Sequence, residues 1–144
     1  MKYAFGRTNI EIIFAVALTV VIFFFAALFA NPWEKAQKAQ DDILANGVRN
    51  YMEALIEVSQ NDPGLFWEIA YSAYDTEKEI GSCTECVDLA GLSPKYFGNP
   101  PIDENSGGSK EKSGYYILFK DNVLEIGALH PRGDTPIRLM WFVK

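Results

Sequence analysis

The sequence predicts an α+β fold in which one long N-terminal helix packs on a small C-terminal antiparallel sheet. Three observations support this prediction. An apolar run occupies residues 12–30, an amphipathic helical pattern follows over residues 33–60, and strand-like alternation fills much of residues 114–144. Residues 61–113 connect the helix to the sheet. A helix and a sheet that are each apolar on one side bury those sides against each other, which makes this the simplest assembly.

The apolar run has the length of a membrane span. From Ile12 to Ala30 the chain has no charged residue, and Thr19 is the only polar one. A helix of about 19 residues rises about 29 Å, close to the hydrocarbon thickness of a bilayer. The run is long for the apolar part of a signal peptide, and Asn31-Pro32-Trp33 is a poor cleavage site. We therefore interpret residues 7–32 as a retained transmembrane helix.

The charges that flank this run predict its orientation. Lys2 and Arg7 precede it, and basic flanks remain on the cytoplasmic side of a membrane. Residues 33–144 should then form one modest extracytoplasmic domain, with Trp33 at the membrane interface. The expected location is the inner (cytoplasmic) membrane, crossed once, with the N-terminus in the cytoplasm.

Beyond Pro32 the helical pattern becomes one-sided. A proline kinks a helix more often than it ends it when apolar periodicity resumes afterwards, so residues 9–60 are predicted to form one helix about 75 Å long. Gly47 weakens it by about 1 kcal/mol, and the NDPG sequence at residues 61–64 ends it. The residues expected on the buried face are Ala36, Ala39, Ile43, Val48, Tyr51, Met52, Leu55 and Val58.

The rest of the chain predicts a short helix, an irregular segment and three strands. Apolar residues between Phe66 and Tyr74 have helical spacing, and residues 81–113 are irregular, with a possible helical turn at residues 87–92. Two strand-like segments flank Asp121-Asn122, a two-residue turn that tolerates positive φ. In the third strand, every second residue from Ile137 onward is apolar, and the face that carries these residues should pack against the helix. Its alternating apolar set is Ile137, Leu139, Trp141 and Val143.

Composition excludes several classes of function. The net charge is -6, and Lys and Arg occur singly, so nucleic-acid binding has no electrostatic support. The sequence has no nucleophile elbow, phosphate-binding loop or dinucleotide fingerprint. Its single histidine, His130, is expected to be an ordinary loop residue. We assign no catalytic residue and no cofactor, and we do not expect an enzyme.

Cys83 and Cys86 form the only CxxC motif, and four interpretations compete. A structural disulfide, within this pair or between chains, suits an oxidising exterior best. A zinc site lacks further ligands nearby. A thioredoxin-type redox site would need the first cysteine at a helix N-terminus. Two reduced cysteines without a function are the fourth possibility.

Two further motifs carry little weight. Asp103, Glu104 and Asn105 offer oxygen ligands and form a weak calcium candidate, but their spacing matches no EF-hand loop, and a solvated turn is the simpler interpretation. The tripeptide Arg132-Gly133-Asp134 is short enough to occur by chance. We therefore assign no metal site.

The N-terminal sequence FGRTNIEIIFAV resembles a known family signal. A short basic leader ends in glycine, a glutamate follows five residues later, and an apolar helix begins there. This pattern resembles the class III signal of type IV pilins and pseudopilins, whose common form is Gly-Phe-Thr-Leu-Ile-Glu. Arg7 replaces the usual Phe and Asn9 the usual Leu. The likeness in sequence covers residues 6 to about 30. Beyond them only the expected order of elements is similar, with a long helix, a connecting loop and an antiparallel sheet. The matching positions are Gly6, Thr8, Ile10 and Glu11.

The resemblance implies a processed precursor. Residues 1–6 would be the leader peptide, and a prepilin peptidase would cleave the bond between Gly6 and Arg7. The new N-terminal amine at Arg7 is commonly methylated in this family. The proline that interrupts the family's membrane helix further in is absent here, since Pro32 lies later. The implied fold is pilin-like.

The implied function is structural. The chain would be a subunit of a type IV pilus-like filament or of a type II secretion pseudopilus, with inner-membrane lipid around it before assembly. Its partners would be other copies of itself or related pilins, and Glu11 would act in assembly. One alternative is an unprocessed, single-pass envelope protein whose outer domain binds a partner. Another is a membrane-tethered thiol–disulfide exchanger that uses Cys83 and Cys86.

Overall fold

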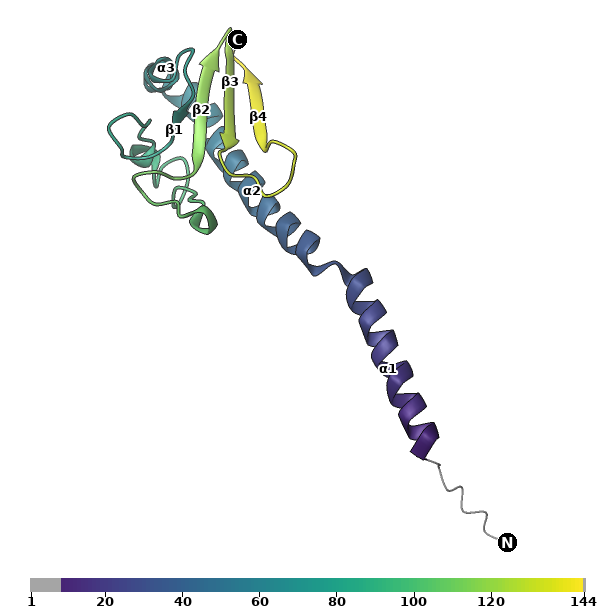
Figure 1. The fold of residues 1–144 in the computed structure, drawn as a ribbon. Coiled ribbons are helices and arrows are strands. Elements are labelled where there is room, and N and C mark those ends of the chain that lie inside the picture. Colours follow the sequence, from purple (N-terminus) through teal and green to yellow (C-terminus); the bar gives the residue numbers. More distant parts are fainter. Residues whose placement is uncertain (1–8, 144) are drawn as a thin grey trace. The chain divides into compact units, whose positions relative to one another are not determined.

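The computed structural model describes residues 9–143, and it has the predicted α+β architecture (Figure 1). A long N-terminal helical segment is followed by a short helix and a small antiparallel sheet. The helices are α1 (Asn9–Ala30), α2 (Pro32–Asn61) and α3 (Pro63–Ser72). The strands are β1 (Lys78–Glu79), β2 (Tyr115–Lys120), β3 (Val123–Ala128) and β4 (Arg138–Phe142), and 3-10 turns occupy Ala90–Leu92 and Glu104–Ser106.

The chain divides into two compact units between Ala36 and Gln37. The first unit contains α1, and the second contains most of α2 with α3 and the sheet. The long helical segment is interrupted at Asn31, whose φ is 35°. This is the residue before Pro32, a position where the proline ring disfavours helical geometry. The break between α1 and α2 therefore lies next to Pro32, where the sequence predicted a kink.

The second half of α2 supplies one side of the hydrophobic core. Val48, Tyr51, Met52, Leu55 and Val58 are buried, as predicted. The prediction was wrong for the first part of this face, because Ala36, Ala39 and Ile43 are exposed. Burial on α2 begins at Leu44, since the sheet domain covers the helix only from there. The buried residues that were missed are Leu44, Gly47 and Ala54.

Local signals define the start of α3. The Asp62 carboxylate accepts a hydrogen bond from the backbone N–H of Leu65 at 3.2 Å, which satisfies one of the free amides of the first turn. Pro63 occupies the first turn, where its missing N–H has no cost. The helix then presents Phe66, Ile69 and Ala70 to the core. The predicted short helix is confirmed.

The sheet has four strands rather than the three predicted, in the antiparallel order β1-β2-β3-β4. The additional strand, β1, has only two residues and therefore leaves no alternating pattern in the sequence. The predicted turn between β2 and β3 is confirmed: Asp121 and Asn122 have φ values of 49° and 60°. The predicted helical turn at residues 87–92 is present only as the short 3-10 turn Ala90–Leu92.

The alternation of buried and less buried residues along β2 and β3 shows which face of the sheet contacts the core. Tyr115, Ile117 and Phe119 of β2, with Leu124 and Ile126 of β3, are all buried. In Figure 1 α2 lies behind these two central strands, and the same residues form one cluster with the buried face of α2. The core therefore lies between the sheet and the second half of α2.

The last strand follows its predicted alternation only in part. Val143 is buried and Ile137 and Trp141 are half-buried, but Leu139 is 41% exposed. β4 is the edge of the sheet, so neighbours cover it from one side only. This exposure could not be predicted from the period-2 pattern, which does not distinguish edge strands from central ones.

Candidate functional site

The apolar helix α1 is the first candidate site. It has 22 residues, which corresponds to a length of about 33 Å, and its described side chains, residues 9–27, are all exposed. The hydroxyl of Thr19 donates a hydrogen bond to the carbonyl oxygen of Ala15 at 2.8 Å, so this polar group is satisfied within the helix. Within the described residues this is the one helical stretch that is long and apolar enough to cross a membrane.

Glu11 lies in the first turn of α1 and is exposed. It is the one charged residue of the helix. The free amides and the dipole at a helix N-terminus favour a negative charge at this position. The predicted processing residues Gly6 and Arg7 lie outside the described residues.

Cys83 and Cys86 form a disulfide, with their Cα atoms 5.0 Å apart. This confirms the predicted disulfide within the motif. Neither cysteine is therefore free to form a bond to another chain. The two cysteines lie in a turn between β1 and the 3-10 turn Ala90–Leu92, not at a helix N-terminus. The thioredoxin-type setting, in which a helix N-terminus activates the first cysteine, is therefore missing around this pair.

The calcium candidate residues differ in burial. Asp103 is only 4% exposed, and its Oδ2 atom has no hydrogen-bond partner among the described residues. Glu104 and Asn105, in contrast, are exposed. No group of three metal-ligating His, Cys, Asp or Glu side chains occurs in the described part of the chain. All three residues line a small pocket of about 190 Å³ between α2 and the β3–β4 loop.

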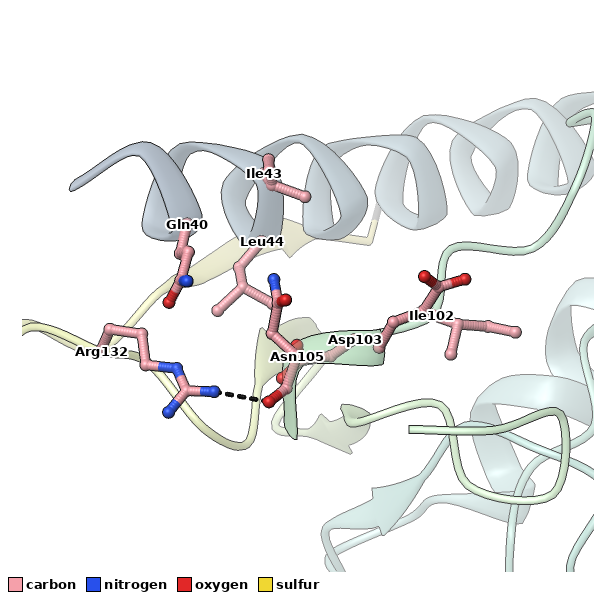
Figure 2. A pocket seen from close by; sticks show the side chains of 8 residues that line it. Gln40, Ile43, Leu44, Ile102, Asp103, Asn105 and Arg132 are labelled. Atoms are coloured by element: carbon pink, nitrogen blue, oxygen red, sulfur yellow. Dashed lines mark hydrogen bonds between the residues drawn. The ribbon is translucent and has the colours of Figure 1, made fainter. Parts of the chain in front are cut away.

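Figure 2 shows this pocket, in which Arg132 faces Asn105. The Arg132 guanidinium donates a hydrogen bond to the backbone carbonyl of Asn105 at 2.8 Å and lies 3.4 Å from the hydroxyl of Ser106. The Asp41 carboxylate accepts hydrogen bonds from the backbone N–H groups of Arg132 and Gly133 at 2.8 and 3.0 Å. These contacts tie the Arg132-Gly133-Asp134 loop to the rest of the domain, which gives the tripeptide a structural role. His130, earlier in the same loop, is exposed.

Three tyrosines in or beside the core have raised pKa values. Burial raises the pKa of Tyr115 to about 12. Burial also raises the pKa of Tyr51, whose hydroxyl donates to the carbonyl of Pro101 at 2.8 Å. For Tyr116, burial and the hydrogen bond to the Glu125 carboxylate, 2.7 Å long, raise the pKa. All three phenols are therefore neutral at physiological pH, and those of Tyr51 and Tyr116 donate hydrogen bonds within the domain.

Sequence reasoning missed two features of the domain. The anchor between Asp41 and the β3–β4 loop joins residues about ninety positions apart, so no local pattern could indicate it. The exposed apolar edge at β4 was also missed. Its signal was present in the run Leu139 to Phe142, in which residues on both faces of the strand are apolar.

Comparisons with family models, with curated proteins and with solved structures gave no match for this chain.

Proposed function

We propose that the chain is a structural subunit of a type IV pilus-like filament or of a type II secretion pseudopilus. In this proposal a prepilin peptidase removes residues 1–6, and α1 then packs against the same helix of other subunits. One observation carries the proposal. A single carboxylate, Glu11, lies in the first turn of an otherwise uncharged membrane-length helix, five residues after a glycine that follows a basic leader.

The energetics of Glu11 support a role in assembly. A carboxylate inside a bilayer costs up to about 3 kcal/mol at the centre of the membrane and less near the interface. The helix dipole offsets part of that cost. Cleavage after Gly6 would create an α-amine at Arg7, and in a bundle that amine from a neighbouring subunit can pair with Glu11. A charge that is unpaired in the lipid thus gains a partner on assembly, and the pairing sets the register of the helices.

The mass of the intact chain, purified from membranes of a host with a working prepilin peptidase, tests the processing step. The proposal expects loss of residues 1–6, with or without a methyl group on Arg7. A full-length chain under these conditions would rule out processing. The unprocessed, single-pass anchored protein would then be the better interpretation.

Replacing Glu11 tests the assembly step. We expect Glu11→Ala to insert into the membrane normally but to lose filaments, because the α-amine of a neighbouring subunit then has no carboxylate partner. Filament yield by electron microscopy and membrane association by fractionation measure the two outcomes separately. Glu34→Ala is the matched control, because Glu34 is an exposed acidic residue in the first turn of α2. Normal filament yield in Glu11→Ala would contradict the pairing.

A further inference from the structure

The outer edge of β4 is open. β4 is the last strand of the sheet, and no strand of the described chain pairs with its free side. The opposite edge, β1, is different, because Val87 forms a parallel bridge with Ile80, the residue after β1, and its N–H donates to the Glu79 carbonyl. Proteins usually protect an open edge with lysine, proline or a bulge. β4, with the sequence RLMWF, contains none of these devices apart from the single charge of Arg138.

The hydrogen-bond pattern identifies the backbone groups that are free at this edge. The Ala128 N–H donates to the Ile137 carbonyl, and the Val143 N–H donates to the Asn122 carbonyl, both at 2.9 Å. Residues that face the neighbouring strand alternate along an antiparallel ladder. Odd-numbered residues of β4 therefore bond to β3. The N–H and C=O groups of Arg138, Met140 and Phe142 point to the open side.

The side chains around this edge are apolar. Leu139, Met140 and Phe142 are 41%, 54% and 71% exposed. A groove of about 470 Å³ lies between the C-terminal end of β4 and α3. None of the residues that line it is charged: Ser59, Pro63, Phe66, Trp67, Trp141, Phe142 and Val143. The edge thus offers both free backbone groups and an uncovered apolar surface.

We propose that β4 pairs antiparallel with β4 of a second copy of this chain, about a two-fold axis at Met140. This register pairs Met140 with Met140 of the other copy and Arg138 with Phe142. It uses the free backbone groups of all three residues on both strands, which allows about six hydrogen bonds. On the core side, Leu139 of one copy lies beside Trp141 of the other, at the mouth of the apolar groove.

Charge favours a second copy as the occupant. Arg138 is the only charged residue of β4, and its guanidinium lies 3.3 Å from the Glu125 carboxylate of its own chain. The proposed register places each Arg138 opposite an aromatic ring, where a cation–π contact is favourable. The two Arg138 residues are four positions apart along the strands, about 13 Å. The register therefore opposes no like charges.

The size of the contact indicates where pairing occurs. A five-residue edge buries much less than the roughly 1,200–2,000 Å² of a stable protein interface. The contact is accordingly weak between free molecules and requires a high local concentration, such as confinement of the chains in one membrane provides. It does not depend on cleavage at Gly6 or on the proposed packing of α1 in a filament.

Cysteine cross-linking of the full-length chain in lipid vesicles tests the register. The two native cysteines are joined to each other, so a new cysteine is the only free thiol. The proposed register places the two Met140 Cα atoms about 5.5 Å apart, within disulfide range. We expect a disulfide-linked dimer from Met140→Cys. Arg138→Cys and Phe142→Cys should cross-link in a mixture of the two variants but not alone. Tyr74→Cys, similarly exposed at 56% but located beside Phe119 of β2 and away from β4, measures random collision.

A blocked edge provides the second test. Met140→Pro removes only an N–H that points away from β3, so the fold should be retained, and circular dichroism checks this. Added to both chains of the Arg138→Cys and Phe142→Cys mixture, it should abolish the cross-link. Dimers of Met140→Cys at the Tyr74→Cys level, or equal cross-linking at all three β4 positions, would overturn the proposal. So would cross-linking of the mixture that survives Met140→Pro.

Discussion

Gly47 lies against the hydroxyl end of the Tyr115 side chain, where α2 and β2 approach each other. A Cβ atom at residue 47 would be 2.2 Å from the Tyr115 hydroxyl oxygen and 2.9 Å or less from two ring carbons. Tyr115 is 1% exposed and also packs edge-on against Tyr51, with ring centroids 5.5 Å apart. The ring therefore has no room to move away. The sequence presented Gly47 as a weak point of a helix, whereas the structure shows that it makes room for a core tyrosine.

We predict that Gly47→Ala lowers the free energy of unfolding by about 1–3 kcal/mol, the usual cost of overpacking a core. This cost outweighs the gain of up to about 1 kcal/mol that alanine gives to a helix. Urea unfolding followed by circular dichroism measures the change. Gly91→Ala is the control, because a Cβ atom there would meet no atom within 4 Å. Equal stability of the two variants would contradict the close contact with Tyr115.

Tyr115 also makes stability depend on alkaline pH. Its pKa is raised from 10.0 to about 12, first by burial and then by the negative charge of Asp103. The folded state therefore binds this proton more tightly than the unfolded state. The resulting stabilisation is complete below pH 10 and is lost as the pH rises through about 12.

We expect the melting temperature to fall between pH 10 and about 12, and to fall less steeply in Tyr115→Phe. The slope should not vanish, because burial also raises the pKa values of Tyr51 and Tyr116. Thermal melts across this range measure the slope, with Tyr71→Phe, at a 61% exposed position, as the control. An unchanged slope in Tyr115→Phe would exclude a contribution from this phenol.

At the scale of elements, one carboxylate connects α2 to the loop between β3 and β4. Asp41 accepts two backbone hydrogen bonds from that loop, at Arg132 and Gly133. Arg132 in turn holds the turn at Asn105 through its guanidinium. Three segments far apart in the sequence are therefore joined by hydrogen bonds, of which Figure 2 shows the one between Arg132 and Asn105. The loop that leads into β4 depends on α2 for its position.

We predict that Asp41→Ala loosens this loop and destabilises the domain by about 1–3 kcal/mol, as expected when charge-assisted hydrogen bonds are lost. Hydrogen exchange should accelerate more at the amides of Arg132 and Gly133 than in the core strand β2, whose exchange reports only the global loss of stability. Asp42→Ala, at the exposed neighbouring position, is the control. If exchange at the two amides is as slow in Asp41→Ala as in Asp42→Ala, the anchor has no influence on the loop.

At the scale of the whole molecule, the chain separates into a membrane-length helix and a domain with its own core. Every residue of the core cluster lies between Leu44 and Val143. The first unit, up to Ala36, contributes nothing to that cluster. The stability of the domain should therefore not depend on α1.

We predict that a fragment of residues 37–144 folds on its own and is soluble without detergent. Its near-ultraviolet circular dichroism should match the contribution of the same domain in the full chain, because the aromatic core is retained. Its urea midpoint should equal that of the domain transition in the full-length protein. A fragment that has helix but no cooperative transition would show that α1 is needed for folding.

Much of this fold follows from local signals in the sequence. Apolar composition predicts α1, because a helix that can cross a bilayer needs only a long, uninterrupted run of apolar residues. The NDPG segment predicts the boundary between α2 and α3, and Asp121-Asn122 predicts the hairpin, because their φ preferences are properties of single residues. The disulfide between Cys83 and Cys86 also joins near neighbours. Of the candidate site, the position of Glu11 in a first turn was predictable for the same reason.

The remaining features depend on which distant residues meet. Tyr115 is the reason that residue 47 must be a glycine, and Asp41 determines the position of the β3–β4 loop. Leu139 is exposed because β4 is an edge strand. Tyr115 and Asp41 lie far along the sequence from the residues that they contact. The position of β4 at the edge depends on the order of all the strands in the sheet. Local propensity and composition are therefore enough to predict the helices, the hairpin and the apolar segment. The packing partners, the short strand β1 and the open edge follow instead from long-range contacts, because these contacts determine which side of each element is covered.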